Sequence, residues 1–279
     1  MTMISYAQIG EDVLLRRVFP PHYVGFFVDV GANHPVYCSV TKHFYDSGWR
    51  GINVEPGAVF SEVEKHRAGD LNLNVAVSDE RSSLTFYEFP DASGLSTLSP
   101  EVAKLRQDAG QRCVERTVDV VTLKDICQQH VGDRTIDFMS IDVEGRELEV
   151  IRGADWSKWR PRIVLVEANG VEAWQPILEG ADYHRANFDG INVWFVRDED
   201  KHWLEPLRVP VTAEDNYLAA SQLKGLVECL ERFAAEGATD QFASTSLRVG
   251  LKVAHTLQQA AHRFPRLASV AKSAIRRAA

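Results

Sequence analysis

Short apolar runs alternate along the chain with polar stretches in which apolar residues recur at helical spacing. In the first run, Phe26–Val30, odd and even positions are apolar with one exception, which predicts a strand buried on both faces. Comparable runs at 51–55 and 71–77 predict two further strands, and the stretches 36–47 and 57–67 predict helices. This alternation predicts parallel strands joined by right-handed crossovers.

The middle of the chain is less regular, and the parallel pattern then resumes. Partly exposed strands at 84–89 and 113–120, with a helix at 100–108 between them, predict a flap beside a ligand site. A dipeptide of turn residues, Asp189-Gly190, joins the last two strands and predicts an antiparallel hairpin. The other predicted elements are a helix at 122–130 capped by Thr122, a strand at 136–145, a helix at 146–152, a strand at 162–167, a helix at 171–180 and strands at 183–188 and 191–196.

Residues 201–279 do not continue this alternation. Pro206 indicates a linker-like passage, and helices are predicted at 214–236 and 245–263. We therefore predict an α/β domain at 1–200, with a mostly parallel sheet and an antiparallel last strand. A helical C-terminal extension follows it.

The net charge of −8 conceals an asymmetry between the two parts. Residues 241–279 hold seven Lys or Arg and no acid, so the first 240 residues carry 24 basic against 39 acidic side chains. An acidic body argues against nucleic-acid binding. We favour a helical lid or a contact between copies of a homo-oligomer as the role of this basic tail, with peripheral contact with a membrane surface as the alternative.

The composition, 45% hydrophobic and 25% charged, is that of a globular protein. No apolar run approaches 18 residues and no signal peptide is recognised, so we expect a cytoplasmic protein without a transmembrane segment. The cysteines show no C-x-x-C spacing, which argues against a zinc site or a disulfide framework. They are Cys38, Cys113, Cys127 and Cys229.

Polar residues at the ends of the first two strands indicate a cofactor site. Asp29 precedes a turn in which Gly31 and Asn33 tolerate unusual backbone conformations. The glycines of G-x-G-x-x-G are missing except for Gly31, which disfavours a dinucleotide. Glu55 ends the second strand, where a carboxylate can accept both hydroxyls of a ribose. An acid before a glycine turn without a pyrophosphate cradle fits S-adenosylmethionine (SAM), and an ordinary turn without a ligand is the alternative.

Three further carboxylates are predicted at the same edge of the sheet. Asp142 and Glu144 share one face of their strand, and Glu167 ends the neighbouring strand. One of them could accept a proton from a hydroxyl, or the set could hold Mg²⁺, and some could instead cap the helix at 146–152. His34 is a candidate general base or simply a turn residue.

Five motifs together resemble the FkbM family of SAM-dependent methyltransferases, over roughly residues 5–197. They are Tyr6–Asp12, Val28–Asn33, Trp49–Pro56, Asn74–Asp79 and Ile141–Gly145. The resemblance implies a Rossmann-like class I sheet and O-methylation of a hydroxyl on a sugar, glycoconjugate or natural product, so the partner is a small-molecule or glycan acceptor.

The resemblance also implies roles for individual residues. Asp142 and Glu144 would face the reaction centre, and Pro35 replaces a glycine that the family often has after the turn. The cofactor-binding residues implied are Gln8, Asp29, Gly31, Asn33, Glu55, Ser78 and Asp79. The alternative is a non-catalytic subunit with this fold that docks a glycosyltransferase or a membrane surface through its basic tail.

Overall fold

The computed structural model describes residues 3–170 and 172–222. The chain forms two compact units, 1–217 and 218–279, and the description below concerns the first. The helix predicted at 245–263, and most of the one predicted at 214–236, lie outside the described residues. The division predicted at residue 200 and the helical extension stay predictions.

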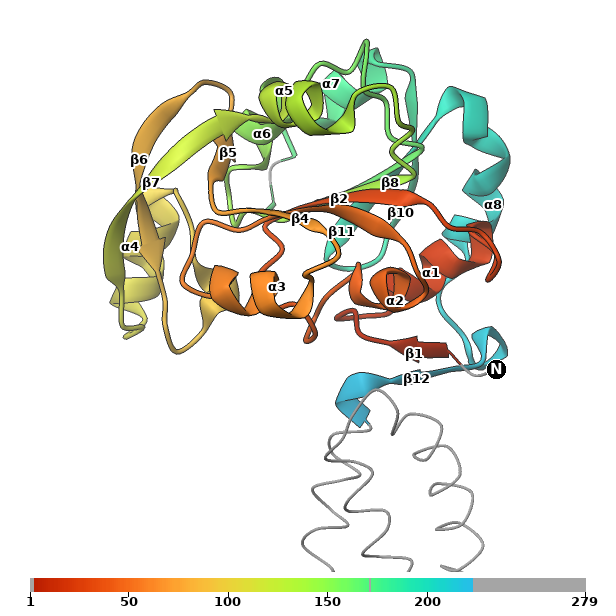
Figure 1. Cartoon of the computed structure of the whole chain (residues 1–279), viewed down its shortest axis with the longest axis horizontal. Coiled ribbons are helices and arrows are strands. Elements are labelled where there is room, and N and C mark those ends of the chain that lie inside the picture. The colour runs from red at the N-terminus through yellow and green to blue at the C-terminus, as the bar shows by residue number, and fades with distance from the viewer. Residues whose placement is uncertain (1–2, 171, 223–279) are drawn as a thin grey trace, which may run out of the picture. The chain divides into compact units, whose positions relative to one another are not determined.

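The described residues form short helices and strands in alternation (Figure 1). In chain order they are β1 (Met3–Ser5), α1 (Glu11–Val18), β2 (Phe26–Val30), α2 (Lys42–Asp46), β3 (Arg50–Val54), α3 (Phe60–His66), β4 (Leu71–Leu73), β5 (Ala76–Ser78), β6 (Ser82–Glu88), η1 (Ser93–Leu95), α4 (Pro100–Asp108), β7 (Val114–Thr122), α5 (Leu123–Ile126), η2 (Cys127–Val131), β8 (Phe138–Ile141), α6 (Glu147–Arg152), β9 (Ile163–Glu167), α7 (Gln175–Gly180), β10 (Tyr183–Phe188), β11 (Asn192–Arg197), η3 (Asp198–Trp203), α8 (Leu204–Arg208), η4 (Ala213–Asp215) and β12 (Tyr217–Ala219).

A seven-stranded sheet in the order β10-β11-β9-β8-β2-β3-β4 is the centre of the unit. The strands β4, β3, β2, β8 and β9 pair in parallel, whereas β11 pairs antiparallel with both β9 and β10. The mixed α/β fold with a mostly parallel sheet is therefore confirmed, and so is the hairpin predicted across Asp189-Gly190.

Helices cover both faces of this sheet, with α1, α2 and α3 on one side and α5, α6 and α7 on the other (Figure 1). Side chains from β2 alternate between the two layers. Phe27 packs into the aromatic core with Phe44, Trp49 and Phe138, whereas Val28 packs into a second, larger and mainly aliphatic core on the opposite face. Burial of both faces explains the nearly continuous apolar run in the sequence of this strand.

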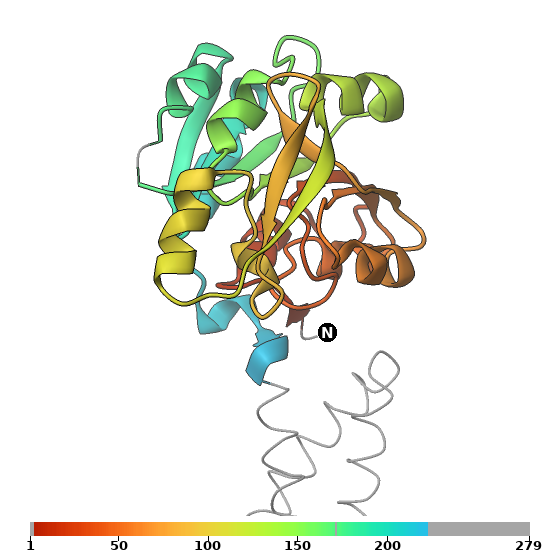
Figure 2. The same ribbon diagram turned by 90° about the vertical axis from the view of Figure 1, so that its left-hand side faces the viewer.

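A second, three-stranded sheet in the order β5-β7-β6 forms the predicted flap. Figure 2 views the long β6–β7 pair face on, with α4 beside it. The single strand predicted at 71–77 is wrong, because β4 joins the central sheet and β5 pairs with β7. Asn74 lies at the break between β4 and β5. Its side-chain amide donates to the Glu55 carbonyl at 2.8 Å, and its backbone does not continue the strand pairing of β4.

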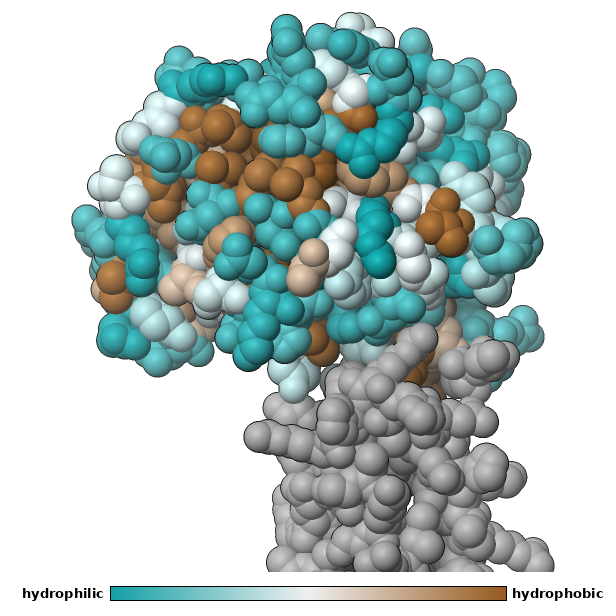
Figure 3. Space-filling view, in the orientation of Figure 1, coloured by the Kyte–Doolittle hydropathy of each residue, from teal (hydrophilic) through white to brown (hydrophobic). Residues whose placement is uncertain are grey.

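The strand at one edge of the central sheet, β4, is short. The edge strand β4 has three residues, which limits the row of unpaired backbone groups that it can expose. Figure 3 shows apolar side chains gathered between α5 and α3, over β4 and β5.

Among residues 3–170 and 172–222, no helix combines the length and apolar character needed to cross a bilayer.

Two predicted segments differ in detail. The helix predicted at 36–47 is confined to α2, because the buried guanidinium of Arg67 holds the preceding loop in place through the Pro35 carbonyl and the hydroxyls of Ser39 and Thr41. The linker-like passage predicted around Pro206 is also wrong. Leu207 is fully buried against the aromatic core, so α8 belongs to the compact unit.

Candidate functional site

A cavity of about 730 Å³ opens at the carboxyl ends of β2, β3, β8 and β9. Its walls are the turns after these strands, the segment 37–40, Gln8 and the flap segment 90–98. Ligands of open α/β sheets bind at this edge. The cavity has the size of a small-molecule or cofactor site.

The turn after β2 depends on a glycine. Gly31 has φ +85°, and a Cβ there would lie 1.7 Å from the carbonyl oxygen of Asp142. The N–H groups of Gly31 and Ala32 both donate to the Val54 carbonyl at 3.0 Å. The absence of a side chain thus lets the turns after β2, β3 and β8 meet at one point.

Glu55 lies just beyond β3 and is 6% exposed. Its Oε2 accepts the N–H of Asn33 at 2.9 Å, and its Oε1 accepts the N–H of Gly57 at 2.7 Å. Burial raises the pKa of Glu55 to about 7. Each oxygen keeps a lone pair, so the fixed carboxylate can still accept two hydroxyls of a bound diol.

Asp29 is buried within β2 and also lines the cavity. It accepts a hydrogen bond from the Thr41 hydroxyl at 2.8 Å. Burial raises the pKa of Asp29 to about 6, although Thr41 and Arg67 oppose the rise. The contact joins the end of β2 to Thr41, the residue that follows the cavity-wall segment 37–40.

His34 lines the cavity, but its ring is part of the turn. Its Nδ1 accepts the N–H groups of Val36 at 3.1 Å and Tyr37 at 3.0 Å. Burial lowers the pKa of His34, which favours the neutral ring that these two bonds require. This geometry agrees with the turn role that the sequence offered as an alternative to a general base.

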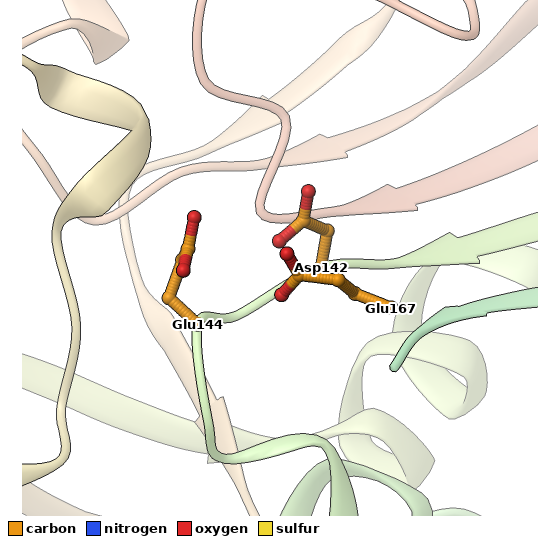
Figure 4. A group of neighbouring side chains, drawn as sticks. All are labelled: Asp142, Glu144 and Glu167. Carbon is orange, nitrogen blue, oxygen red and sulfur yellow. The ribbon is translucent and has the colours of Figure 1, made fainter. Parts of the chain in front are cut away.

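Three carboxylates converge at the other side of the cavity, at the ends of β8 and β9 (Figure 4). Asp142, Glu144 and Glu167 each offer an oxygen, and these oxygens lie within 4.8 Å of one another. The Oδ1 of Asp142 is buried and has no hydrogen-bond partner among the described residues. Burial raises the pKa of Asp142 well above its usual range, and the charges of Glu167 and Glu144 add to the rise.

Glu144 is held by the flap. Its backbone has φ +57°, and its carboxylate pairs with the Arg106 guanidinium of α4 at 2.5 Å. Burial and then Glu167 raise the pKa of Glu144 to about 7, against the opposing effect of Arg106. The Thr97 hydroxyl donates to the Glu144 carbonyl at 2.7 Å. The flap therefore reaches both the backbone and the side chain of this residue.

Sequence reasoning missed Arg106 and Glu147. Glu147 accepts the N–H groups of Val143 at 3.2 Å and Gly145 at 3.0 Å, so it supports the turn that carries Glu144. From the sequence, we expected Asp142 or Glu144 as an alternative to cap the start of this helix, and Glu147 makes these contacts instead. The sequence feature that could have identified Arg106 is its position three residues after Ala103. Residues with this spacing share one face of a helix, and Ala103 is buried, so Arg106 lies toward the covered face of α4.

Nine of the eleven candidate residues line the cavity. Ser78 and Asp79 do not. Ser78 is buried at the end of β5 and donates to Asp79 at 3.2 Å, while their neighbours Ala76 and Val77 form part of the wall. The nine are Gln8, Asp29, Gly31, Asn33, His34, Glu55, Asp142, Glu144 and Glu167.

A family sequence model, described as the Methyltransferase FkbM domain, matches residues 29–201. The match covers more than half of the chain. The chain belongs to the FkbM methyltransferase family. In this FkbM methyltransferase the matched segment begins at the cavity residue Asp29 and contains the strand ends that bear Glu55 and the carboxylate cluster.

Two curated relatives support the same reaction class for the FkbM methyltransferase. "Methyltransferase sdnD" of Sordaria araneosa is 29% identical over 211 residues, which are 63% of this chain and 80% of the relative. "Methyltransferase 1" of Beauveria bassiana (strain ARSEF 2860) is 29% identical over 156 residues, which are 48% of this chain and 60% of the relative. The family and both relatives support methyl transfer.

Proposed function

We propose that this protein is a SAM-dependent O-methyltransferase that acts on a hydroxyl of a sugar, glycoconjugate or natural product. The observation that carries the proposal is a single cavity with Glu55 at one side and three converging carboxylates at the other. The strand order, with β11 antiparallel in an otherwise parallel run, supports a Rossmann-like class I sheet.

The residues around Glu55 fit the cofactor. The Glu55 carboxylate would accept the ribose hydroxyls, since its position is already fixed by the N–H groups of Asn33 and Gly57. Asp29, Gly31, Asn33 and Gln8 would form the rest of that wall. When bound, SAM supplies the methyl group together with its own leaving group. The protein then has mainly to place an acceptor oxygen correctly.

The carboxylate cluster suits the acceptor. Asp142 would accept the hydroxyl proton as methyl transfer proceeds, because a raised pKa suits a general base near neutral pH. Its unpartnered Oδ1 is the atom that we assign to this contact. Glu167 and Glu144 would share hydrogen bonds to the acceptor.

The same three side chains would hold Mg²⁺ if the reaction uses a metal. Oxygen ligands suit this cation, and it would make the acceptor hydroxyl more acidic. Arg106, which already neutralises Glu144, reduces the charge that the cluster offers to a metal. We therefore assign proton transfer to Asp142 and make metal dependence an outcome of the test.

Calorimetric titration with SAM and S-adenosylhomocysteine (SAH) tests the cofactor assignment. We expect micromolar binding by the wild type and a loss of at least about tenfold in Glu55→Ala, because two hydrogen bonds to a charged group are lost. Glu62→Ala is the matched control, since Glu62 is a partly exposed acid on α3 outside the cavity. Absence of binding in the wild type, with or without Mg²⁺, would exclude the proposed cofactor.

Transfer of a labelled methyl group to a panel of neutral glycosides and polyketide alcohols tests the chemistry. Asp142→Asn should reduce kcat about 100-fold or more while SAH affinity stays within about threefold, because the amide cannot accept the proton. Titration with Mg²⁺ and with a chelator in the same assay separates the two roles of the cluster. A chelator-sensitive rate would assign the carboxylates to a metal.

A further inference from the structure

Two buried acids at the start of α1 have no part in the chemistry proposed above. Asp12 is 0% and Glu11 is 3% exposed. Acids this deeply buried need several hydrogen bonds to offset their lost hydration. Their partners lie in the preceding loop, residues 5–9, from which Gln8 reaches the cavity wall.

The two acids bind the loop on either side of Gln8. Asp12 accepts the Ser5 hydroxyl at 2.6 Å and the Tyr6 N–H at 2.8 Å. Glu11 accepts the Ile9 N–H at 2.8 Å, and its other oxygen lies 3.3 Å from the Asn192 amide nitrogen of β11. Glu11 thus connects the loop to β11 of the central sheet, although the loop itself forms no strand of that sheet.

The loop is also tied directly to the cavity wall. The Tyr6 carbonyl accepts the N–H of Ser39 at 3.1 Å, and Ser39 lines the cavity. The side-chain amide of Gln8 makes no hydrogen bond to the other described residues and is exposed at the cavity. An amide offers both a donor and an acceptor, so it matches a ligand that presents both.

We propose that Asp12 and Glu11 are positioning residues that hold Gln8 at the cavity, where its amide hydrogen-bonds the aminoacyl nucleoside bound there. The inference rests on the proposed function, because that ligand is SAM or its product SAH. It deepens the proposed site by assigning a ligand-binding role to two side chains that do not touch the ligand.

Calorimetry with SAH on the full chain tests this assignment through a double-mutant cycle. Gln8→Ala and Asp12→Ala should each weaken SAH binding about tenfold, the effect of losing one or two hydrogen bonds. The double variant should bind SAH within about threefold of Gln8→Ala, because Asp12 acts only through Gln8. Asp12→Asn should retain near wild-type affinity, since its amide can accept the Tyr6 N–H and donate to the Ser5 oxygen.

Asp137 provides a matched control. It is also a buried acid that accepts a hydroxyl at 2.6 Å, from Tyr23, and a backbone N–H at 2.8 Å, from Phe26, but it does not line the cavity. Asp137→Ala should lower Tm about as much as Asp12→Ala and leave SAH affinity unchanged. If Asp12→Ala does not fold, Ser5→Ala removes one of the same bonds and enters the cycle in its place.

Two results would overturn the inference while leaving the proposed function intact. One is equal SAH affinity in Asp12→Ala and Asp137→Ala, and the other is full additivity of Gln8→Ala and Asp12→Ala. A wild type that binds neither SAM nor SAH would instead overturn the proposed function, and this inference with it.

Discussion

At the scale of single residues, contacts of the backbone decide the geometry of the site as much as side chains do. Gly31 is the point where the turns after β2 and β8 touch, and its N–H group fixes the position of the turn after β3. Asn33, two residues later, adopts φ +44° and donates its N–H to Glu55. The position of the Glu55 carboxylate, which we assign to the ribose, therefore depends on the turn after β2.

Gly31→Ala should be far more destabilising than an alanine at another glycine of similar conformation. A left-handed backbone costs a non-glycine residue about 1–2 kcal/mol, and the overlap with the Asp142 carbonyl adds about 1–3 kcal/mol. Gly48 has φ +96°, and a Cβ added there would meet no atom of another residue within 4 Å, so Gly48→Ala should show the strain alone. Urea denaturation measures both variants, and equal losses would contradict the crowding at Gly31.

At the scale of elements, the flap is attached at both sides of the cavity. The Ser93 hydroxyl of η1 donates to the Asn33 side chain at 2.8 Å on the side that we assign to the cofactor, and Arg106 of α4 pairs with Glu144 on the side that we assign to the acceptor. Arg106 also donates to the Leu95 carbonyl. The flap therefore has direct contacts to both groups of residues that the proposed reaction brings together.

Arg106→Leu should loosen the flap without unfolding the unit. The two side chains of this ion pair are 17% and 16% exposed, so the pair is intermediate between surface and buried ion pairs. Its loss should therefore lower the local free energy of unfolding by about 1–3 kcal/mol. Hydrogen exchange of the backbone amides of residues 91–98 should accelerate about tenfold. Lys104→Leu on the exposed side of the same helix is the control, because its pair with Asp108 is largely exposed to solvent. Equal exchange in the two variants would contradict the assigned contact.

The elements also show what could be predicted from the sequence. Strands β2, β3, β8, β9 and β11 follow from apolar runs, because a doubly covered sheet imposes such runs, and β10 follows from the Asp189-Gly190 hairpin. The break between β4 and β5 could not be predicted, since Asn74 bonds to the backbone beyond β3. Arg106 and Glu144 meet only through the tertiary fold, so their pairing left no local pattern.

At the scale of the whole molecule, the buried acids make stability depend on pH. Burial raises the pKa of Asp12, Glu55 and Glu144 to about 7 and that of Asp29 to about 6. Unfolding would return each group to an ordinary value near 4. Between these values the folded protein binds more protons than the unfolded chain, so each group lowers the free energy of unfolding as pH rises.

The ligand-free protein should therefore lose stability as the pH rises from 5 to about 7, by up to about 1.4 kcal/mol per pH unit for each of these groups, and the loss should level off toward pH 8. Asp12→Asn should flatten the dependence of Tm on pH, because it removes one such group and can keep both hydrogen bonds. Asp200 gives the control: burial raises its pKa, but ion pairs with Arg162 and Arg197 outweigh burial and lower it. It stays ionised in both states over this range, so Asp200→Asn should shift the whole curve without changing its slope. A Tm that rises from pH 5 to pH 8 in the wild type would contradict the raised pKa values of these buried acids.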